Sequence, residues 1–244
     1  MFFGLVYLVF LGYICNTMNI NFDIETVRAR HSVRQFTDEP LTADQKQTLS
    51  ALISECNAEG GIHLQLVTDE PHAYGRSIMA KYGKFSGVRN YVCLVAGKGD
   101  DAEESLGYYG EMVVLKAQEL GLNTCWCGLS FSKRNVDCEV ARDEMIHGLI
   151  ALGNGVSQGV QHKSKSPDMV SEGYNLAASW FRRGVDCALL APTAVNQQKF
   201  HFEYSQGNKV KASTGSGFFS HMDLGIAKLH FEIGAGCPVE WLAE

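Results

Sequence analysis

The feature that most strongly limits the folds open to this chain of 244 residues is a continuous apolar run at residues 91–96. The run reads Tyr-Val-Cys-Leu-Val-Ala and lacks the polar alternation of a half-exposed strand. Such a run is expected of a central strand that is buried on both faces. A strand of this kind needs other elements to cover it, so the segments around it decide the fold class.

Helical segments flank this strand in the sequence. Thr42 and Gln45 have the spacing of a capping box, and the helix that they start is expected to end at the glycine pair 60–61. The acidic pair at 100–101 is expected to cap the next helix, and Gly121 is expected to end it. Helices mixed with strands of different patterning indicate an α+β architecture.

Shorter segments have the pattern of strands. Residues 62–66 alternate between apolar and polar side chains, as a half-buried strand does. Residues 206–208 (Gln-Gly-Asn) are predicted to form the turn of a hairpin between strands at 200–204 and 209–212.

Composition excludes some classes of function. The chain is 45% hydrophobic and 20% charged, which is typical of a globular protein with a sizeable core. Its formal net charge of −6 argues against nucleic acid as the main partner, because binding to a phosphate backbone needs a clustered basic face.

The eight cysteines show no Cys-x-x-Cys spacing, and no His-Glu-x-x-His occurs, so we expect neither a metal site nor a redox dithiol. Cys93, Cys125 and Cys127 are predicted to be buried, reduced thiols, with the last two on one face of a strand. This pattern favours a reducing, cytoplasmic location.

The N-terminal segment, residues 1–18, is set apart from the rest by its apolar character. Residues 1–15 carry no charge, yet they are shorter than the ~20 residues that span a bilayer and lack the basic start of a signal peptide. We favour a start at Met18, or a tail packed on the body of the protein, over a membrane anchor.

Residues 30–36 bring together side chains that suit a phosphate group. Arg30 and Arg34 offer rigid pairs of donors, and His31 and Ser32 add two further polar groups between them. Pro40 follows shortly afterwards. Taken alone, this motif favours a solvated basic turn over a binding site.

Three further stretches accompany this motif and together carry a family resemblance. Residues 108–122 have the pattern of a long helix that leads into 123–128 (Asn-Thr-Cys-Trp-Cys-Gly), residues 150–153 precede the basic segment 162–165, and residues 191–198 read Ala-Pro-Thr-Ala-Val-Asn-Gln-Gln. With Arg-x-Ser-x-Arg-x-Phe, these stretches resemble the flavin-dependent nitroreductase family. Thr193 and Lys199 stand where the family signature has serine and proline, and this signature lies unusually late in the chain.

The resemblance implies a nitroreductase-like mixed or antiparallel sheet flanked by helices, and the late signature indicates two fused half-repeats. The predicted boundaries are a first half at 19–154, a polar linker at 155–173 and a second half at 174–244. Family members resemble one another in being dimers with flavin sites between subunits. A duplicated chain would then fold as a pseudo-dimer, and we expect a monomer with one composite site.

The cofactor that the resemblance implies is FMN. Its predicted binding residues are Arg30, His31, Ser32, Arg34, Gly128, Lys163, Lys165, Pro192, Thr193 and Asn196. The first three would approach the phosphate and ribityl chain, and Arg34 the N1/C2 edge. The two lysines would form a second phosphate clamp. Asn196, with Pro192 and Thr193, would come from the other half, and the Gly128 amide would lie near N5.

Each position also has a simpler interpretation: His31 as a surface residue, the two lysines as solvated side chains, and Asn196 as a turn residue.

The activity implied by the resemblance is ping-pong hydride transfer from NADH or NADPH to a nitroaromatic or quinone-like acceptor. No dedicated catalytic side chain is expected, because the cofactor carries the chemistry. A flavin-binding or degenerate relative without physiological reductase activity is the alternative. A membrane-attached interaction protein that uses residues 1–15 is a third possibility.

Overall fold

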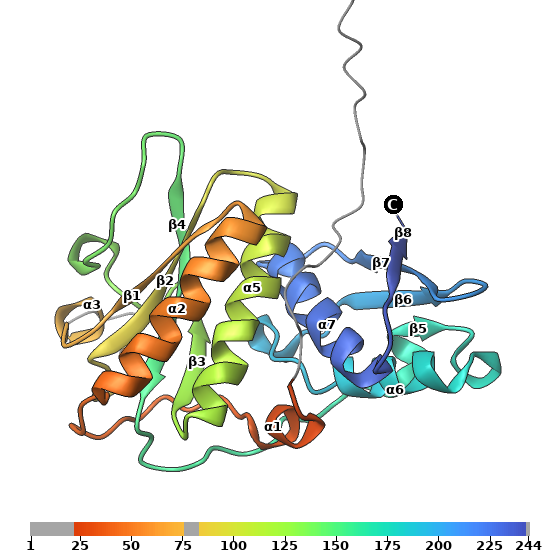
Figure 1. Cartoon of the computed structure of the whole chain (residues 1–244), viewed down its shortest axis with the longest axis horizontal. Helices are drawn as coiled ribbons and strands as arrows, with labels where there is room; N and C mark the ends of the chain where they lie inside the picture. Colours follow the sequence, from red (N-terminus) through yellow and green to blue (C-terminus); the bar gives the residue numbers. More distant parts are fainter. Residues whose placement is uncertain (1–21, 76–82, 243–244) are drawn as a thin grey trace, which may run out of the picture.

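The computed structural model describes residues 22–75 and 83–242, which form two four-stranded sheets with helices packed between and around them. Figure 1 shows the first sheet with α2 and α5 on the left and the second sheet with α6 and α7 on the right. The helices are α1 (Ile24–Ala29), α2 (Ala43–Gly60), α3 (His72–Gly75), α5 (Asp100–Glu119), α6 (Ser179–Ala188) and α7 (Ser220–Ala235). Short 3₁₀ turns lie at η1 (Lys133–Asn135), η2 (Pro167–Met169), η3 (Tyr174–Leu176) and η4 (Ala194–Asn196).

The first sheet is wholly antiparallel and is built around the apolar run at 91–96. Its strands are β1 (His63–Val67), β2 (Asn90–Ala96), β3 (Asn123–Cys127) and β4 (Met145–Gly153), in the order β1-β2-β4-β3. Every residue of β2 is buried, and the strand lies between two others. The prediction of a central strand is therefore confirmed.

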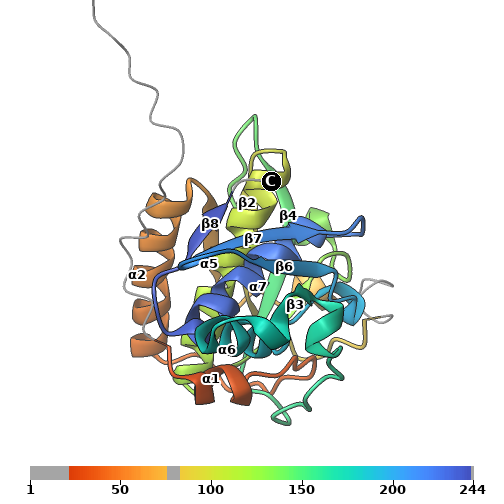
Figure 2. The ribbon, with the colours of Figure 1, turned by 90° about the vertical axis from the view of Figure 1, so that its right-hand side faces the viewer.

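The second sheet is mixed. Its strands are β5 (Ser171–Glu172), β6 (Phe200–Tyr204), β7 (Lys209–Thr214) and β8 (Glu240–Leu242), in that order. The β6–β7 pair is antiparallel and confirms the predicted hairpin, whereas β5 and β8 pair in parallel at the two edges. Figure 2 shows β6 and β7 lying across α7, with α6 beside them. The fold is thus the expected α+β arrangement of mixed and antiparallel sheets flanked by helices.

The helix ends agree with most of the local predictions. At the start of α2, Thr42 accepts from the backbone of Gln45, whose side chain returns the bond, so the capping box is confirmed. Gly61 and Gly121 follow α2 and α5 in the left-handed conformation that glycine tolerates best.

The predicted cap of α5 is wrong. Asp100 and Asp101 lie inside the first turn of the helix, and Gly99, with φ of 128°, occupies the capping position without a side-chain bond. The two carboxylates still favour this helix, because negative charge near the N-terminus interacts well with the exposed backbone N–H groups.

Helices α5 and α7 form the seam between the two sheets. Glycines let the two backbones approach closely, because a Cβ at Gly107 would overlap the carbonyl oxygen of Met222 and one at Gly225 would overlap that of Glu104. The two contacts are reciprocal. On α5, Gly107 follows Glu104 by three positions, and on α7, Gly225 follows Met222 by three positions. Tyr108 on α5 also donates to the carboxylate of Glu232 on α7 (2.6 Å).

The order of elements is repeated on the two sides of this seam. Helix α2, strands β1 and β2, helix α5 and strand β3 are followed later by α6, β6, β7, α7 and β8. Two asparagines, one before β1 and one before β6, act differently: Asn57 bonds both backbone groups of Leu64, whereas Asn196 donates to the carbonyl of Lys163. The internal duplication and the half boundaries at 154 and 174 stay predictions.

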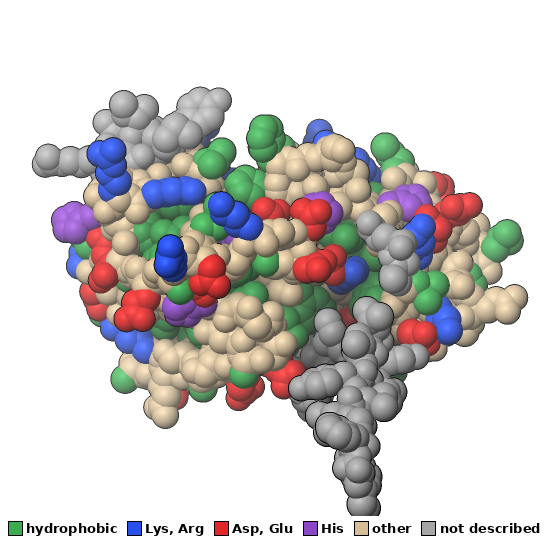
Figure 3. All heavy atoms as spheres, turned by 90° about the horizontal axis from the view of Figure 1, so that it is seen from above, with side chains coloured by type: hydrophobic (Ala, Val, Ile, Leu, Met, Phe, Trp, Pro, Cys, Tyr) green, Lys and Arg blue, Asp and Glu red, His purple; other side chains and the backbone are tan. Residues whose placement is uncertain are grey.

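The thiols behave as the sequence indicated. Cys93, Cys125 and Cys127 are buried, and no disulfide joins any of the cysteines in the described part of the chain. None of the helices in residues 22–75 and 83–242 has the length and apolarity to span a bilayer, and the segment 1–15 lies outside the described residues. On the face seen in Figure 3, basic and acidic side chains are interspersed.

Candidate functional site

Arg30, the first residue of the basic motif, lies in the protein interior. It ends α1, and its side chain is only 4% exposed. Its Nε lies 3.6 Å from Oε1 of Glu111, and its Nη2 donates to the carbonyl of Leu190 at 3.4 Å. Burial lowers the pKa of Arg30, and the charge of Glu111 opposes this effect. Arg30 therefore links the N-terminal segment to α5 and to the chain after α6.

Glu111 is the centre of a buried polar network at the seam. This carboxylate is fully buried on α5 and accepts from Trp126 Nε1 (2.7 Å) on β3. His230 Nε2 of α7 lies 2.9 Å from its Oε1. Arg30 Nε and His230 Nδ1 have no hydrogen-bond partner within the described residues. The network therefore joins four separate segments, including helices from both sides of the seam.

The chain after Arg30 runs past the start of β3. Ser32 pairs with Thr124 in an isolated parallel bridge, and its hydroxyl bonds Cys125. Burial raises the pKa of the Cys125 thiol, while the Arg34 charge and the Ser32 bond oppose that rise. His31 is half-buried; burial lowers its pKa, and the charge of Arg30 adds to this effect.

Arg34 is exposed, and its guanidinium has no hydrogen-bond or ion-pair partner among the described residues. Arg34 is thus the arginine of this motif with its donors free to meet a ligand.

The basic segment at 162–165 lies against the loop that carries the late signature. The backbone carbonyl of Lys163 accepts from Asn196 Nδ2 and from Gln198 Nε2, both at 2.9 Å. Lys165 donates its backbone N–H to Gln198 Oε1 (2.9 Å) and its Nζ to the Gln198 carbonyl (2.7 Å). The Lys163 side chain is exposed, whereas the Lys165 ammonium is already bound within the protein.

His162 and Ser164 attach the same segment to the end of α6. His162 Nε2 lies 3.0 Å from the carbonyl oxygen of Leu189, and Ser164 Oγ donates to that oxygen at 2.9 Å. Burial lowers the pKa of His162, and the positive charges of Arg30, His230 and His31 lower it further. The segment therefore lies close to the N-terminal motif as well as to the signature loop.

The signature loop has an unusual backbone. Val195, Asn196 and Gln198 have φ of 46°, 57° and 45°, in the left-handed region that β-branched residues rarely adopt. The side chain of Val195 is also 97% exposed, so packing gives no reason for its position. Strained backbone of this kind persists where the surroundings hold it, and it is concentrated at functional sites.

Buried contacts hold this loop in place. Asp223, in the first turn of α7, accepts from the backbone N–H of Ala194 (2.9 Å) and from Gln197 Nε2 (2.7 Å). Burial raises the pKa of Asp223 to about 7, and the two hydrogen bonds oppose that rise. Thr193 Oγ1 accepts from the N–H of Gln198 (3.1 Å), and Pro192 is buried beside it.

Gly128 lies where β3 ends and α7 begins. A Cβ at this position would overlap the ring of Phe219, the residue that precedes α7. The absence of a side chain thus lets a flat aromatic group lie against the backbone here.

The structure brings the predicted site residues together in part. The segments 30–32, 162–165 and 189–198 contact one another, and Gly128 lies at the same end of α7 as the signature loop. Glu111, Gln198 and Asp223 were missed as site residues. A charged residue directly before the apolar stretch 112–115 could have indicated Glu111, whereas no local pattern marks Asp223.

A separate surface hollow of about 450 Å³ lies elsewhere and contains none of the predicted residues. Its lining consists of Glu70, His72, Arg134, Asn135, Val136 and Asp137.

Comparisons with known proteins agree with the resemblance. Residues 23–235 match the family model described as "Putative TM nitroreductase". Among solved structures, "a putative nitroreductase" from Thermotoga maritima superposes with a TM-score of 0.64 at 21% identity, covering 92% of this chain and 87% of that chain. At this level of identity the likeness concerns the fold. A search of curated proteins found no match.

Two further solved structures contain FMN. "A putative nitroreductase in complex with FMN" from Desulfovibrio desulfuricans has a TM-score of 0.47 at 13% identity, with 60% of this chain and 94% of that chain covered. A nitroreductase with bound FMN from Bacteroides fragilis has a TM-score of 0.42 at 20% identity, with 62% and 95% covered.

Proposed function

The chain belongs to the family described as "Putative TM nitroreductase", and from this premise we propose that it is an FMN-dependent oxidoreductase that uses NADH or NADPH. The observation that carries the proposal is the convergence of segments 30–32, 162–165 and 189–198, which are far apart in the sequence. Each of the three contains residues that resemble the flavin-binding positions of the nitroreductase family. Their contact supports one composite site in a single chain.

The donors available in this region fit a phosphorylated ligand. The exposed guanidinium of Arg34, the half-buried His31 and Ser32, and the exposed ammonium of Lys163 offer positive charge and hydrogen bonds. Arg30 and Lys165 contribute differently, because their polar groups are already bound to acceptors inside the protein. These two residues support the shape of the site, and Lys163, His31 and Ser32 would bind the phosphate.

The other part of the site fits a planar ring system. Gly128 already accommodates the flat ring of Phe219 against its backbone. The loop that carries Asn196 is held in a strained conformation by Asp223 and Gln198. A fixed loop positions its polar groups without further loss of entropy when a ligand binds.

When bound, FMN would supply hydride transfer from the reduced nicotinamide to a nitroaromatic or quinone-like acceptor in ping-pong order. The chain's own residues would position the FMN and tune its reactivity. Arg34 would place a fixed positive charge at the pyrimidine edge, where it stabilises developing negative charge. Glu111 holds Arg30 in place, and Asp223 holds the loop from 194 to 197.

The alternative is a flavin-binding relative without physiological reductase activity. Two observations support this alternative. Arg30 and Lys165 already contact Glu111 and Gln198 inside the protein. Lys199, which replaces the signature proline, donates from its ammonium to the carbonyl of Ser216. The alternative predicts bound FMN that reduced nicotinamide does not reduce at a useful rate.

The test is anaerobic reduction of the FMN-loaded, full-length chain. We expect yellow protein after gel filtration, loss of the oxidised-flavin absorbance on addition of NADH or NADPH, and its return on addition of a nitroaromatic or quinone. Retained FMN that does not bleach would select the binding protein. Failure to retain FMN would reject both proposals.

A further inference from the structure

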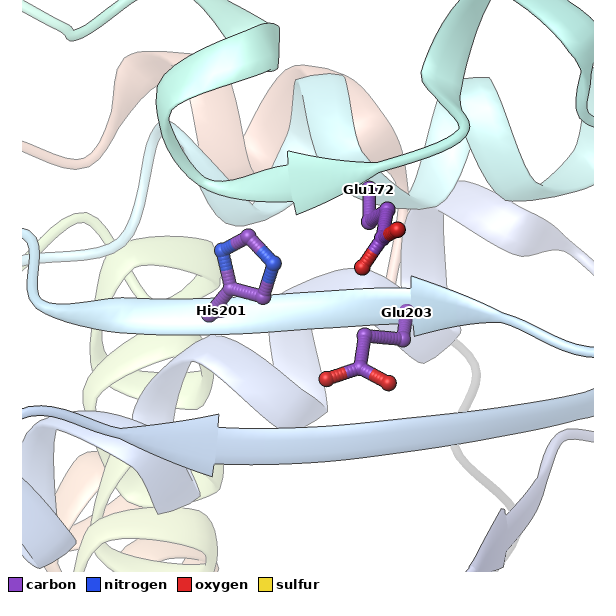
Figure 4. Close-up of side chains that lie close together, drawn as sticks. All are labelled: Glu172, His201 and Glu203. Atoms are coloured by element: carbon purple, nitrogen blue, oxygen red, sulfur yellow. The ribbon is translucent and has the colours of Figure 1, made fainter.

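Three potential metal ligands converge on the outer face of the second sheet. Glu172 belongs to β5, and His201 and Glu203 belong to β6 (Figure 4). Side chains alternate along a strand, so Phe200 and Phe202 of β6 enter the core while His201 and Glu203 share the opposite face. Glu172 joins them because the parallel pairing of β5 with β6 places it directly opposite Glu203.

The geometry of the donor atoms suits one cation. A ring nitrogen of His201 and one oxygen from each carboxylate all lie within 4.8 Å of one another. Zinc binds such atoms at ~2.0–2.2 Å, so two ligands on one ion lie up to about 4 Å apart. Small side-chain rotations would therefore bring all three donors to one ion. Figure 4 shows His201 and Glu172 turned toward each other, with the carboxylate of Glu203 on the other side of the β6 ribbon.

These three side chains have no hydrogen-bond or ion-pair partner within the described residues. Other histidines differ in this respect: His63 lies 3.1 Å from the carboxylate of Glu144, and His230 lies 2.9 Å from that of Glu111. Polar groups that form neither of these contacts with the protein remain available to a ligand.

The charge on this face is unbalanced without a cation. Like charges directly opposite one another in a sheet are destabilising, and Glu172 faces Glu203 in this way. Lys211 of β7 lies opposite Glu203 on the other side, and it forms no ion pair in the described structure. One lysine balances at most one of the two carboxylates, whereas a divalent ion balances both.

We infer that Glu172, His201 and Glu203 form a site for a divalent transition metal of the zinc class. The imidazole selects such an ion over Mg²⁺ and Ca²⁺, which prefer oxygen ligands. Water would complete the coordination, because the chain supplies three ligands. This inference departs from the sequence expectation of no metal. No short motif marks the site, because its ligands meet through strand pairing between positions 172 and 201–203.

The site would fasten β5 to the sheet. Strand β5 has only two residues, lies at the edge and pairs with β6 alone. A metal held by Glu172 on β5 and by two residues of β6 would add a second attachment, and a ligand that binds only the folded state raises its stability. This role is independent of the proposed oxidoreductase activity.

The experiment is zinc titration of the full-length, chelator-treated protein without added flavin. We expect one zinc ion per chain by calorimetry and a Tm that rises with zinc concentration, while Mg²⁺ at the same concentration has no effect. Co²⁺ should give an absorption spectrum without thiolate charge-transfer bands, which separates this site from the cysteines. Thiolate bands, or no zinc binding, would overturn the inference.

Variants identify the ligands. His201→Ala should weaken zinc binding by more than the roughly 10–100-fold that is typical of losing a hydrogen-bond partner of a ligand. Glu172→Gln provides a second variant at an exposed edge position, and it should abolish the zinc-dependent rise in Tm without lowering the Tm of the metal-free protein. His63→Ala is the matched control, since that strand histidine pairs with one carboxylate only. Equal losses in His63→Ala and His201→Ala, or no loss in either ligand variant, would reject the site.

Discussion

Asp223 should make the stability of the protein fall as the pH rises. This carboxyl group is 4% exposed, and burial raises its pKa from the ordinary 3.8 to about 7. Between these two values the folded state retains a proton that the unfolded state has lost. The free energy of unfolding therefore decreases with pH across this window and becomes independent of this group above about pH 7.

The size of the effect follows from the two pKa values. Each pKa unit corresponds to about 1.36 kcal/mol, so the rise from 3.8 to about 7 amounts to on the order of 4 kcal/mol. Asp223→Asn removes the titration and keeps an oxygen that can accept from the N–H of Ala194. The NH2 of the asparagine would face the Nε2 donor of Gln197, which no longer has an acceptor there. The variant is therefore expected to be less stable than the native protein at acidic pH.

The informative quantity is the difference in free energy of unfolding between the variant and the native protein, measured at two pH values. Urea unfolding at about pH 5 and about pH 8 should show that the native protein loses stability relative to Asp223→Asn by up to several kcal/mol. Thr193→Val is the matched control, because it removes the hydroxyl that accepts from Gln198 in the same loop without removing a titrating group. A stability difference for Asp223→Asn that stays constant with pH would refute the reasoning.

Three further predictions concern the seam and the flavin site. Gly107→Ala should lower the free energy of unfolding in urea by about 1–3 kcal/mol despite the better helix propensity of alanine, since the new Cβ overlaps the backbone of Met222; unchanged stability would contradict the tight seam. Arg34→Ala should weaken FMN binding by about 1.5–3 kcal/mol in a fluorescence titration and lower the flavin potential; unaltered affinity and potential would assign Arg34 to the solvated surface. Light scattering combined with flavin absorbance should give one chain and one FMN per particle, whereas two FMN per chain, or flavin bound only in dimers, would exclude the composite site.

Local sequence patterns predicted the features that are determined by residues close together in the sequence. The capping box at Thr42, the glycine at 121 and the hairpin at 206–208 each depend on a few neighbouring residues, and each is present. The buried strand β2 was also predictable, because its composition reflects burial on both faces. The cap of α5 was missed by one residue, since both Gly99 and an aspartate are acceptable N-caps and the choice depends on the loop before the helix.

Roles that depend on distant partners could not be predicted in this way. Nothing near Asp223 in the sequence indicates that its carboxylate holds a loop that lies nearly thirty residues earlier. The grouping of Glu172 with His201 and Glu203 likewise requires the register of β5 on β6, and a one-residue shift of β5 would turn Glu172 to the other face of the sheet. Motifs identify residue types, whereas tertiary pairing decides which of them meet.

Arg30 shows how the two kinds of information combine. The motif Arg-x-Ser-x-Arg offers two arginines as flavin ligands, yet the two occupy opposite environments, with Arg30 buried against Glu111 and Arg34 exposed. A buried guanidinium needs a carboxylate, and removing either partner would leave an uncompensated charge in the interior. Because His230 of α7 shares that carboxylate, the N-terminal motif is fixed to the seam between the two sheets. Burial of Arg30 thus positions His31 close to His162, in the segment that also bonds the signature loop, and the proposed single composite flavin site depends on this arrangement.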